Sequence, residues 1–114
     1  MKKITVALLL SAVTLGASAG GNVDTGKTLA EKYACATCHG KDFNTPIDPS
    51  YPKLAGQHRD YLEHALVAYK RADGANGRNN AIMTGQVKPL SNQDIKDIAA
   101  YLHSLPGTLT VQHR

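Results

Sequence analysis

The stretch YACATCHG, residues 33–40, contains both cysteines of this 114-residue chain. Cys35 and Cys38 are separated by two residues, and His39 follows the second cysteine directly. Thiols and an imidazole at this spacing occur in four kinds of site: a short disulfide, half of a zinc site, a dithiol redox centre and a covalent haem attachment. The rest of the sequence has to distinguish among these four.

Three of the four sites lack support elsewhere in the chain. A structural zinc ion takes four ligands, and the remaining histidines show no paired spacing of the zinc-finger kind; they are His58, His64, His103 and His113. A thioredoxin-like dithiol belongs near a βαβ pattern, but no segment alternates apolar and polar residues as a strand does. A disulfide between Cys35 and Cys38 would close a very short loop and stabilise the fold little. The motif therefore predicts covalent attachment of a c-type haem.

The spacing of the motif suits this chemistry. Cys35 and Cys38 can each add to one vinyl group on the same edge of the porphyrin, and His39 then has its side chain brought under the iron. The composition also favours a large apolar cofactor, because the chain has no Trp, one Phe and five Tyr to build a core. A haem would supply apolar surface that a small domain lacks.

The first 19 residues predict a secretory signal peptide. Lys2 and Lys3 precede a mostly apolar run from Ile4 to Leu15, and Ala17-Ser18-Ala19 forms a small-x-small cleavage signal. The run is shorter than the ~17–25 residues that a membrane-spanning helix needs. We therefore expect export to the periplasm, a mature domain of residues 20–114, and no membrane span after the signal is removed.

The mature domain carries little net charge. Without Lys2 and Lys3 the 13 basic residues become 11, against 9 acidic ones, so the net charge falls from +4 to +2. A nucleic-acid-binding domain usually shows a clustered basic face. We expect no nucleic-acid partner.

Helical periodicity predicts three helices and no strand. They cover residues 24–37, about 57–71 and 91–105, and the segments 40–56 and 72–90 are expected to be irregular. This is an all-α domain with long loops, and wrapping a cofactor would account for loops of this length.

Capping residues support the first and the last of the predicted helices. Asp24 or Asn22 is available as the N-cap of the first, and Ser91 with Asp94 has the spacing of a capping box at the start of the last.

Four motifs in this order resemble the class I cytochromes c, particularly the small bacterial cytochrome c553 and cytochrome c4-like monohaem domains. They are CATCHG at 35–40, YPKLAGQ at 51–57, NNAIMTG at 79–85 and LSNQDIKDIAAYL at 90–102. The resemblance implies the class I cytochrome c fold, with three main helices and long loops around one haem. Proteins of the c4 type carry two such domains, whereas this sequence shows one set of motifs.

The resemblance also assigns the sixth iron ligand to Met83. This residue is the one methionine besides the initiator, and it lies in a polar segment rather than on a helical apolar face. His64, beside the apolar stripe of the second helix, is the rival ligand. Ligation by His39 and Met83 suits electron transfer rather than oxygen chemistry.

Further roles follow from the resemblance alone. The carbonyl of Pro52 is expected to accept the Nδ1 proton of His39 and so orient the ring. Gly26 is expected to lie where the first and last helices cross, against Ile98 and Tyr101. The sequence does not decide whether the haem propionates are bound by any of Tyr61, Tyr69, Arg78, Asn79 and Asn80.

The predicted function is that of a soluble periplasmic electron carrier, not an enzyme. One covalently attached haem c, with its iron held by His39 and Met83, would exchange electrons with transient donor and acceptor proteins, and the carrier is expected to be a monomer. One alternative is a haem c subunit of a periplasmic dehydrogenase or sulfur-oxidising enzyme. Another is an enzyme or gas sensor with five-coordinate haem, in which Met83 is not bound.

Processing and attachment can be tested by one measurement. The mature protein is expected to begin at or near Gly20 and to carry one haem that survives acid-organic extraction, because thioether bonds do not break under those conditions. The intact mass reports both features. A chain with free thiols, or with a disulfide and no haem, would contradict the prediction.

Overall fold

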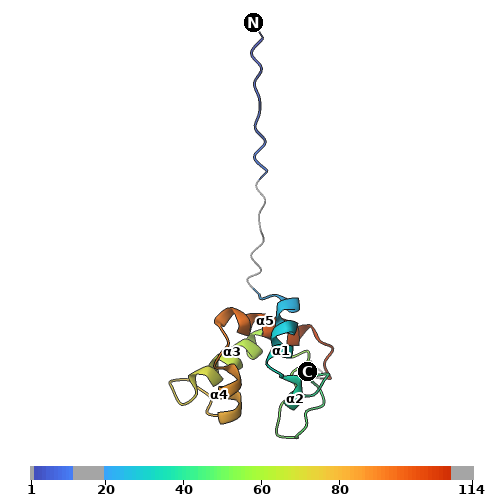
Figure 1. Cartoon of the computed structure of the whole chain (residues 1–114), viewed down its shortest axis with the longest axis vertical. Helices are drawn as coiled ribbons and strands as arrows, with labels where there is room; N and C mark the ends of the chain where they lie inside the picture. Colours follow the sequence, from blue (N-terminus) through green and yellow to red (C-terminus); the bar gives the residue numbers. More distant parts are fainter. Residues whose placement is uncertain (1, 12–19, 109–114) are drawn as a thin grey trace, which may run out of the picture.

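The computed structural model describes residues 2–11 and 20–108. The predicted cleavage signal at Ala17-Ser18-Ala19 and the histidine His113 lie outside these residues. Residues 2–11 are exposed and contain no helix or strand, and they run away from the helical domain (Figure 1). Within the described ranges, no helix is long and apolar enough to cross a membrane.

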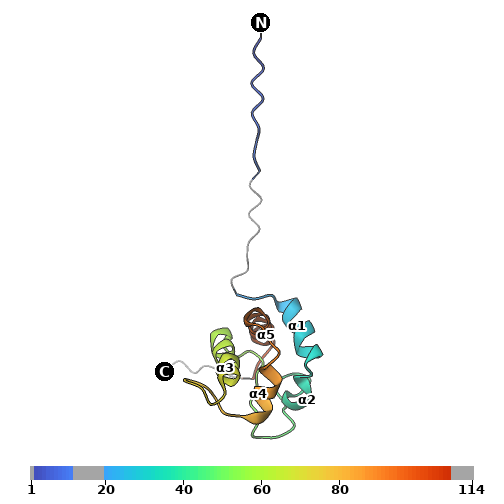
Figure 2. The ribbon, with the colours of Figure 1, turned by 60° about the vertical axis from the view of Figure 1, so that its left-hand side comes forward.

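The domain is built from helices, and the residues described contain no strand. The helices are α1 (Val23–Lys32), α2 (Ala36–His39), α3 (Arg59–Arg71), α4 (Ala81–Val87) and α5 (Asn92–Ser104). Helix α5 packs against α1 and α3, and α3 also packs against α4. Turning the molecule shows α1 and α3 on either side of α5, with α2 and α4 toward the opposite end of the domain (Figure 2). The predicted all-α class is confirmed.

Helices α1 and α5 both begin at predicted N-cap residues. The Asn22 side chain accepts a hydrogen bond from the Thr25 backbone N–H at 2.9 Å, so Asn22 is the N-cap of α1. The alternative N-cap, Asp24, was wrong, because Asp24 lies inside the first turn. Ser91 and Asp94 form the predicted capping box of α5, with hydrogen bonds of 2.9 and 3.0 Å.

The predicted single helix over 24–37 was wrong, because two helices meet there. Helix α1 ends in a Schellman motif, in which the Cys35 N–H bonds to the Ala30 carbonyl and the Ala34 N–H to the Glu31 carbonyl. Ala34 takes the left-handed conformation of this motif, with φ of 53°. The chain therefore turns before Cys35 and starts the short helix α2.

The segment 72–90 was also predicted wrongly, since it contains α4. The Asn80 side chain caps this helix by accepting a hydrogen bond from the Met83 backbone N–H at 3.0 Å. Helix α4 spans only 7 residues, and that is too short for apolar periodicity to reveal it against the turn-forming residues on both sides.

The crossing of α1 and α5 depends on the absence of a side chain at Gly26. A Cβ atom at this position would lie 1.9 Å from the Asp97 carbonyl oxygen and 2.8 Å from the Tyr101 Cβ. The predicted contact with Tyr101 is confirmed, whereas the nearest backbone belongs to Asp97 rather than to the predicted Ile98. The two helices thus approach closely enough to enclose a core.

The core lies between α1, α3 and α5. Phe43 meets Tyr101 edge-on, with ring centroids 6.1 Å apart. The large buried apolar side chains are Phe43, Leu62, Val87, Leu90, Ile95, Ile98 and Leu102. Most of them come from α5 and the segment before it, so this helix organises the domain.

Two helical glycines offer a matched test of the crossing. Gly26→Ala is expected to lower the free energy of unfolding by ~1–3 kcal/mol, because its Cβ would overlap fixed backbone. Gly85→Ala is the control, since a Cβ there meets nothing within 4 Å, and it should raise stability by ~0.5–1 kcal/mol. Denaturant unfolding of the mature protein measures both. Equal effects at the two positions would contradict the close crossing.

Candidate cofactor-binding site

A cavity of about 210 Å³ opens between α2, α3, α4 and the segment 50–57. A single water molecule needs only ~10–15 Å³ measured in this way, so the cavity has room for a much larger group. Its apolar walls are Leu54, Leu62, Ala65, Leu66, Ile82 and Leu102. A mostly apolar lining with few polar groups is typical of a site for an organic cofactor.

His39 forms the floor of the cavity and is held in one orientation. It is the last residue of α2 and is only 7% exposed. Its Nδ1 lies 2.9 Å from the Pro52 carbonyl oxygen. Because a carbonyl oxygen only accepts, Nδ1 is the protonated nitrogen, and in the neutral ring Nε2 keeps its lone pair for a metal. The predicted role of Pro52 as the acceptor is confirmed.

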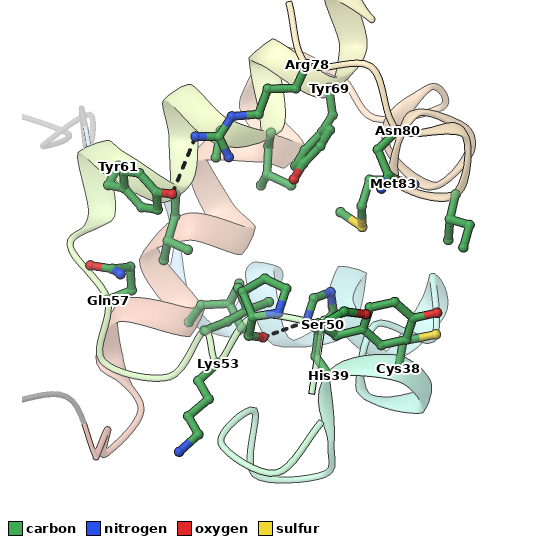
Figure 3. Close-up of a pocket in the computed structure, with 18 residues that line it drawn as sticks. Cys38, His39, Ser50, Lys53, Gln57, Tyr61, Tyr69, Arg78, Asn80 and Met83 are labelled. Carbon is green, nitrogen blue, oxygen red and sulfur yellow. Dashed lines mark hydrogen bonds between the residues drawn. The ribbon is translucent and has the colours of Figure 1, made fainter. Parts of the chain in front are cut away.

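Met83 lies across the cavity from His39 (Figure 3). The side chain is half-buried and lines the cavity from the first half of α4. The helix is tied to α3 by a hydrogen bond of 3.0 Å from the Thr84 hydroxyl to the Tyr69 carbonyl. An imidazole and a thioether therefore face one space from opposite sides, as the two axial ligands of an iron would.

The two cysteines are placed differently. Cys38 lines the cavity, whereas Cys35 is half-buried against the hydrophobic core and is not among the lining residues. They are not joined in a disulfide. Burial raises the pKa of the Cys35 thiol above its usual value, and the neighbouring Cys38 adds a smaller effect in the same direction. Both thiols lie in the turn that presents His39.

The rival ligand His64 is exposed and does not line the cavity. His58 and His103 are exposed, as expected. In the described part of the chain, no three His, Cys, Asp or Glu side chains converge on a point where they could hold a metal ion. The geometry thus favours Met83 over His64 and gives no support to a zinc site.

The sequence left five candidates for binding the haem propionates, and the structure shows which of them line the cavity. Tyr61, Tyr69, Arg78 and Asn80 line the cavity, and Asn79 does not. The Arg78 guanidinium carbon lies 5.6 and 5.5 Å from the ring centroids of Tyr61 and Tyr69. Hydrogen bonds to the hydroxyls, that of Tyr61 first and then that of Tyr69, raise the pKa of Arg78.

Sequence reasoning did not predict that one face of α3 forms a wall of the cavity. Tyr61, Ala65 and Tyr69 recur every four residues, so they share one helix face. An apolar stripe of this kind usually packs in the hydrophobic core, so the sequence alone does not predict that it faces a cavity. Lys53 and Gln57 carried no comparable signal, since they lie in irregular chain before α3.

A protein-family model described as cytochrome c matches residues 23–106. Cytochrome c4 from Stutzerimonas stutzeri is 41% identical over 115 residues, which cover 96% of this chain and 53% of that protein. Cytochrome c-554(548) from Halomonas halodenitrificans is 46% identical over 71 residues, covering 61% of this chain and 82% of that protein. The chain spans about half the length of the cytochromes c4 that it matches.

The fold is also similar to a solved structure. The crystal structure of reduced recombinant cytochrome c4 from Pseudomonas stutzeri superposes with a TM-score of 0.67 at 39% sequence identity. The match covers 78% of this chain and 48% of the other. A further relative, 40% identical over 75 residues, is the thiosulfate dehydrogenase electron acceptor of Thiomonas intermedia. Those residues make up 66% of this chain and 33% of that protein.

Proposed function

The chain belongs to the cytochrome c family, and we propose that it is an electron carrier with one haem held by Cys35, Cys38, His39 and Met83. Its fold is the predicted class I cytochrome c fold. Proteins of this family carry covalently attached haem c. The assignment of the four residues and of a single haem goes beyond this membership.

The observation that carries the proposal is the placement of His39 and Met83 on opposite sides of one apolar cavity (Figure 3). The donor set fits a haem, because imidazole and thioether are its axial ligands in electron-transfer cytochromes. The iron supplies one-electron redox chemistry when the haem is bound. Pro52 fixes the ring of His39. If His39 and Met83 both bind the iron, no coordination site would remain for a substrate.

This arrangement favours a carrier over an enzyme. The Leu54, Leu62 and Leu66 side chains line the cavity, and an apolar lining of this kind would limit the water around the redox centre when the haem is bound. Donor and acceptor proteins would dock briefly, since such encounters use interfaces below ~1,200 Å². The predicted signal peptide at 1–19 would place the carrier in the periplasm. We expect the carrier to be a monomer.

The second candidate is a haem subunit fixed to a sulfur-oxidising or other dehydrogenase. One observation favours it: a relative at 40% identity is the electron acceptor of a thiosulfate dehydrogenase. Purification of the tagged protein from its own periplasm distinguishes the two. A carrier is expected to elute alone at physiological salt. A stoichiometric enzyme partner that stays bound would instead establish the subunit.

Replacement of Met83 tests the ligand set. Met83→Ala is expected to abolish the sulfur-to-iron charge-transfer band of the ferric protein, to admit carbon monoxide to the ferrous haem, and to lower the midpoint potential. The potential falls because a soft sulfur ligand favours ferrous iron. Absorption spectra and potentiometric titration measure the three changes.

His64→Ala is the matched control, since His64 is exposed and lies outside the cavity wall. It should leave the band, the potential and the resistance to carbon monoxide unchanged. A bis-histidine site would give the reverse pattern, with the band and potential kept in the Met83 variant and low-spin character lost in the His64 variant. Carbon monoxide binding by the unaltered protein would point to a five-coordinate haem and an enzyme or sensor.

A further inference from the structure

The end of α3 holds the segment that leads to Met83. Carbonyl groups in the last turn of an α-helix have no donor within the helix and take their hydrogen bonds from elsewhere. In α3, the Arg71 carbonyl accepts a bond from the Gly74 N–H at 2.8 Å, and the Ala68 carbonyl accepts one from the Arg78 N–H at 2.9 Å. The last turn of α3 therefore fixes the path of the chain toward α4.

A side-chain bond then joins α4 itself to the same turn. The Thr84 hydroxyl donates to the Tyr69 carbonyl at 3.0 Å. Thr84 lies in the middle of α4, directly after Met83, and its side chain is half-buried. This bond thus acts at the residue next to the proposed iron ligand.

The two halves of α4 are held differently. At its end, Val87 is buried in the hydrophobic core with Leu90, and the Lys70 ammonium group donates to the Leu90 carbonyl. At its start, Ile82 is exposed. The first half of α4, which carries the proposed ligand, therefore lacks a core anchor of this kind, and Thr84 ties it to α3.

We propose that Thr84 is a positioning residue for Met83: its bond to the Tyr69 carbonyl keeps α4 against α3 and so keeps the Met83 sulfur on the iron. This proposal rests on the proposed function, because it takes Met83 to be an iron ligand.

A competing ligand has to displace the sulfur, and two movements could allow this. Either the Met83 side chain rotates while α4 stays in place, or the first half of α4 moves away from α3. A bound haem would occupy the cavity that Met83 faces (Figure 3) and leave this side chain little room to rotate. The structure therefore favours the second movement, which breaks the Thr84 bond.

The size of the effect follows from this scheme. A bond that exists only in the closed state stabilises that state against the open one. Removing the bond raises the population of the open state, and the apparent affinity for a competing ligand rises by the same factor. One hydrogen bond of ordinary strength corresponds to roughly a 2- to 10-fold change.

The test is an imidazole titration of the mature ferric haem-loaded protein, followed by loss of the sulfur-to-iron charge-transfer band. An imidazole nitrogen replaces the sulfur on the iron, and no electron is transferred. Thr84→Val keeps the branched shape without the hydroxyl, so the imidazole concentration at half-saturation should fall roughly 2- to 10-fold. Thr84→Ser keeps the hydroxyl and should stay close to the unaltered protein. A role in packing alone would reverse this order, because valine preserves the volume of threonine and serine does not.

Thr28→Val is the matched control. The Thr28 hydroxyl also donates to a backbone carbonyl, that of Asp24 at 3.2 Å, but it lies on α1 and does not line the cavity. This variant should leave the imidazole affinity unchanged. If Thr84→Val does not load haem, Thr84→Ala against Thr28→Ala makes the same comparison without a branched side chain.

Two results would overturn the proposal: a Thr84→Val effect no larger than that of Thr28→Val, or a larger effect of Thr84→Ser than of Thr84→Val. Either result, with the charge-transfer band present in the unaltered protein, leaves Met83 as the ligand and removes only the role of Thr84. Absence of the band from the unaltered protein would instead overturn the assignment of Met83, and this proposal with it.

Discussion

The fold depends on one constraint: the chain encloses an apolar cavity that its own side chains do not fill. Ordinary protein interiors are packed almost without voids, whereas here α2, α3 and α4 stand around about 210 Å³ of space. The leucines that face this space would lose their packing partners if it stayed empty. The buried side chains gather instead around α5, where α1 and α3 pack against it. The cofactor of this family is therefore part of the hydrophobic core, and its binding and the folding of the domain stabilise each other.

The irregular segment between α2 and α3 is held in shape by several hydrogen bonds within it. The Asp42 carboxylate accepts hydrogen bonds from the Asn44 and Thr45 backbone N–H groups, both at 2.9 Å. These bonds, the one from Asn44 most of all, lower the pKa of Asp42. Phe43 adopts a left-handed φ of 56°, and its carbonyl accepts from the N–H groups of Leu54 and Ala55. These contacts bring the start of the segment back to its end. They set the position of the Pro52 carbonyl and, through it, the ring of His39.

The sequence predicted those features that depend on local chemistry. The capping box at Ser91 and the attachment motif are visible in neighbouring residues, and the pairing of His39 with Pro52 followed from the family pattern. The break at Ala34 was hidden, because the left-handed position of a Schellman motif is usually a glycine and an alanine there costs ~1–2 kcal/mol. Helix α4 was hidden by its length. The position of Arg78 between two rings could not be predicted, since it depends on how a loop returns to α3.

In the proposed carrier, the surroundings of the cavity would let the site exchange an electron while its iron stays covered. The two proposed ligands come from elements with different supports: His39 from α2, held by the Pro52 carbonyl, and Met83 from α4, held to α3 by Thr84. At the rim, Tyr61 and Ile82 remain 50% and 56% exposed. A protein that approached this rim would meet these side chains and the cation of Arg78. Electron exchange at such a rim requires contact with the edge of the redox centre and no opening of the ligand set, and that is the difference between a carrier and an enzyme.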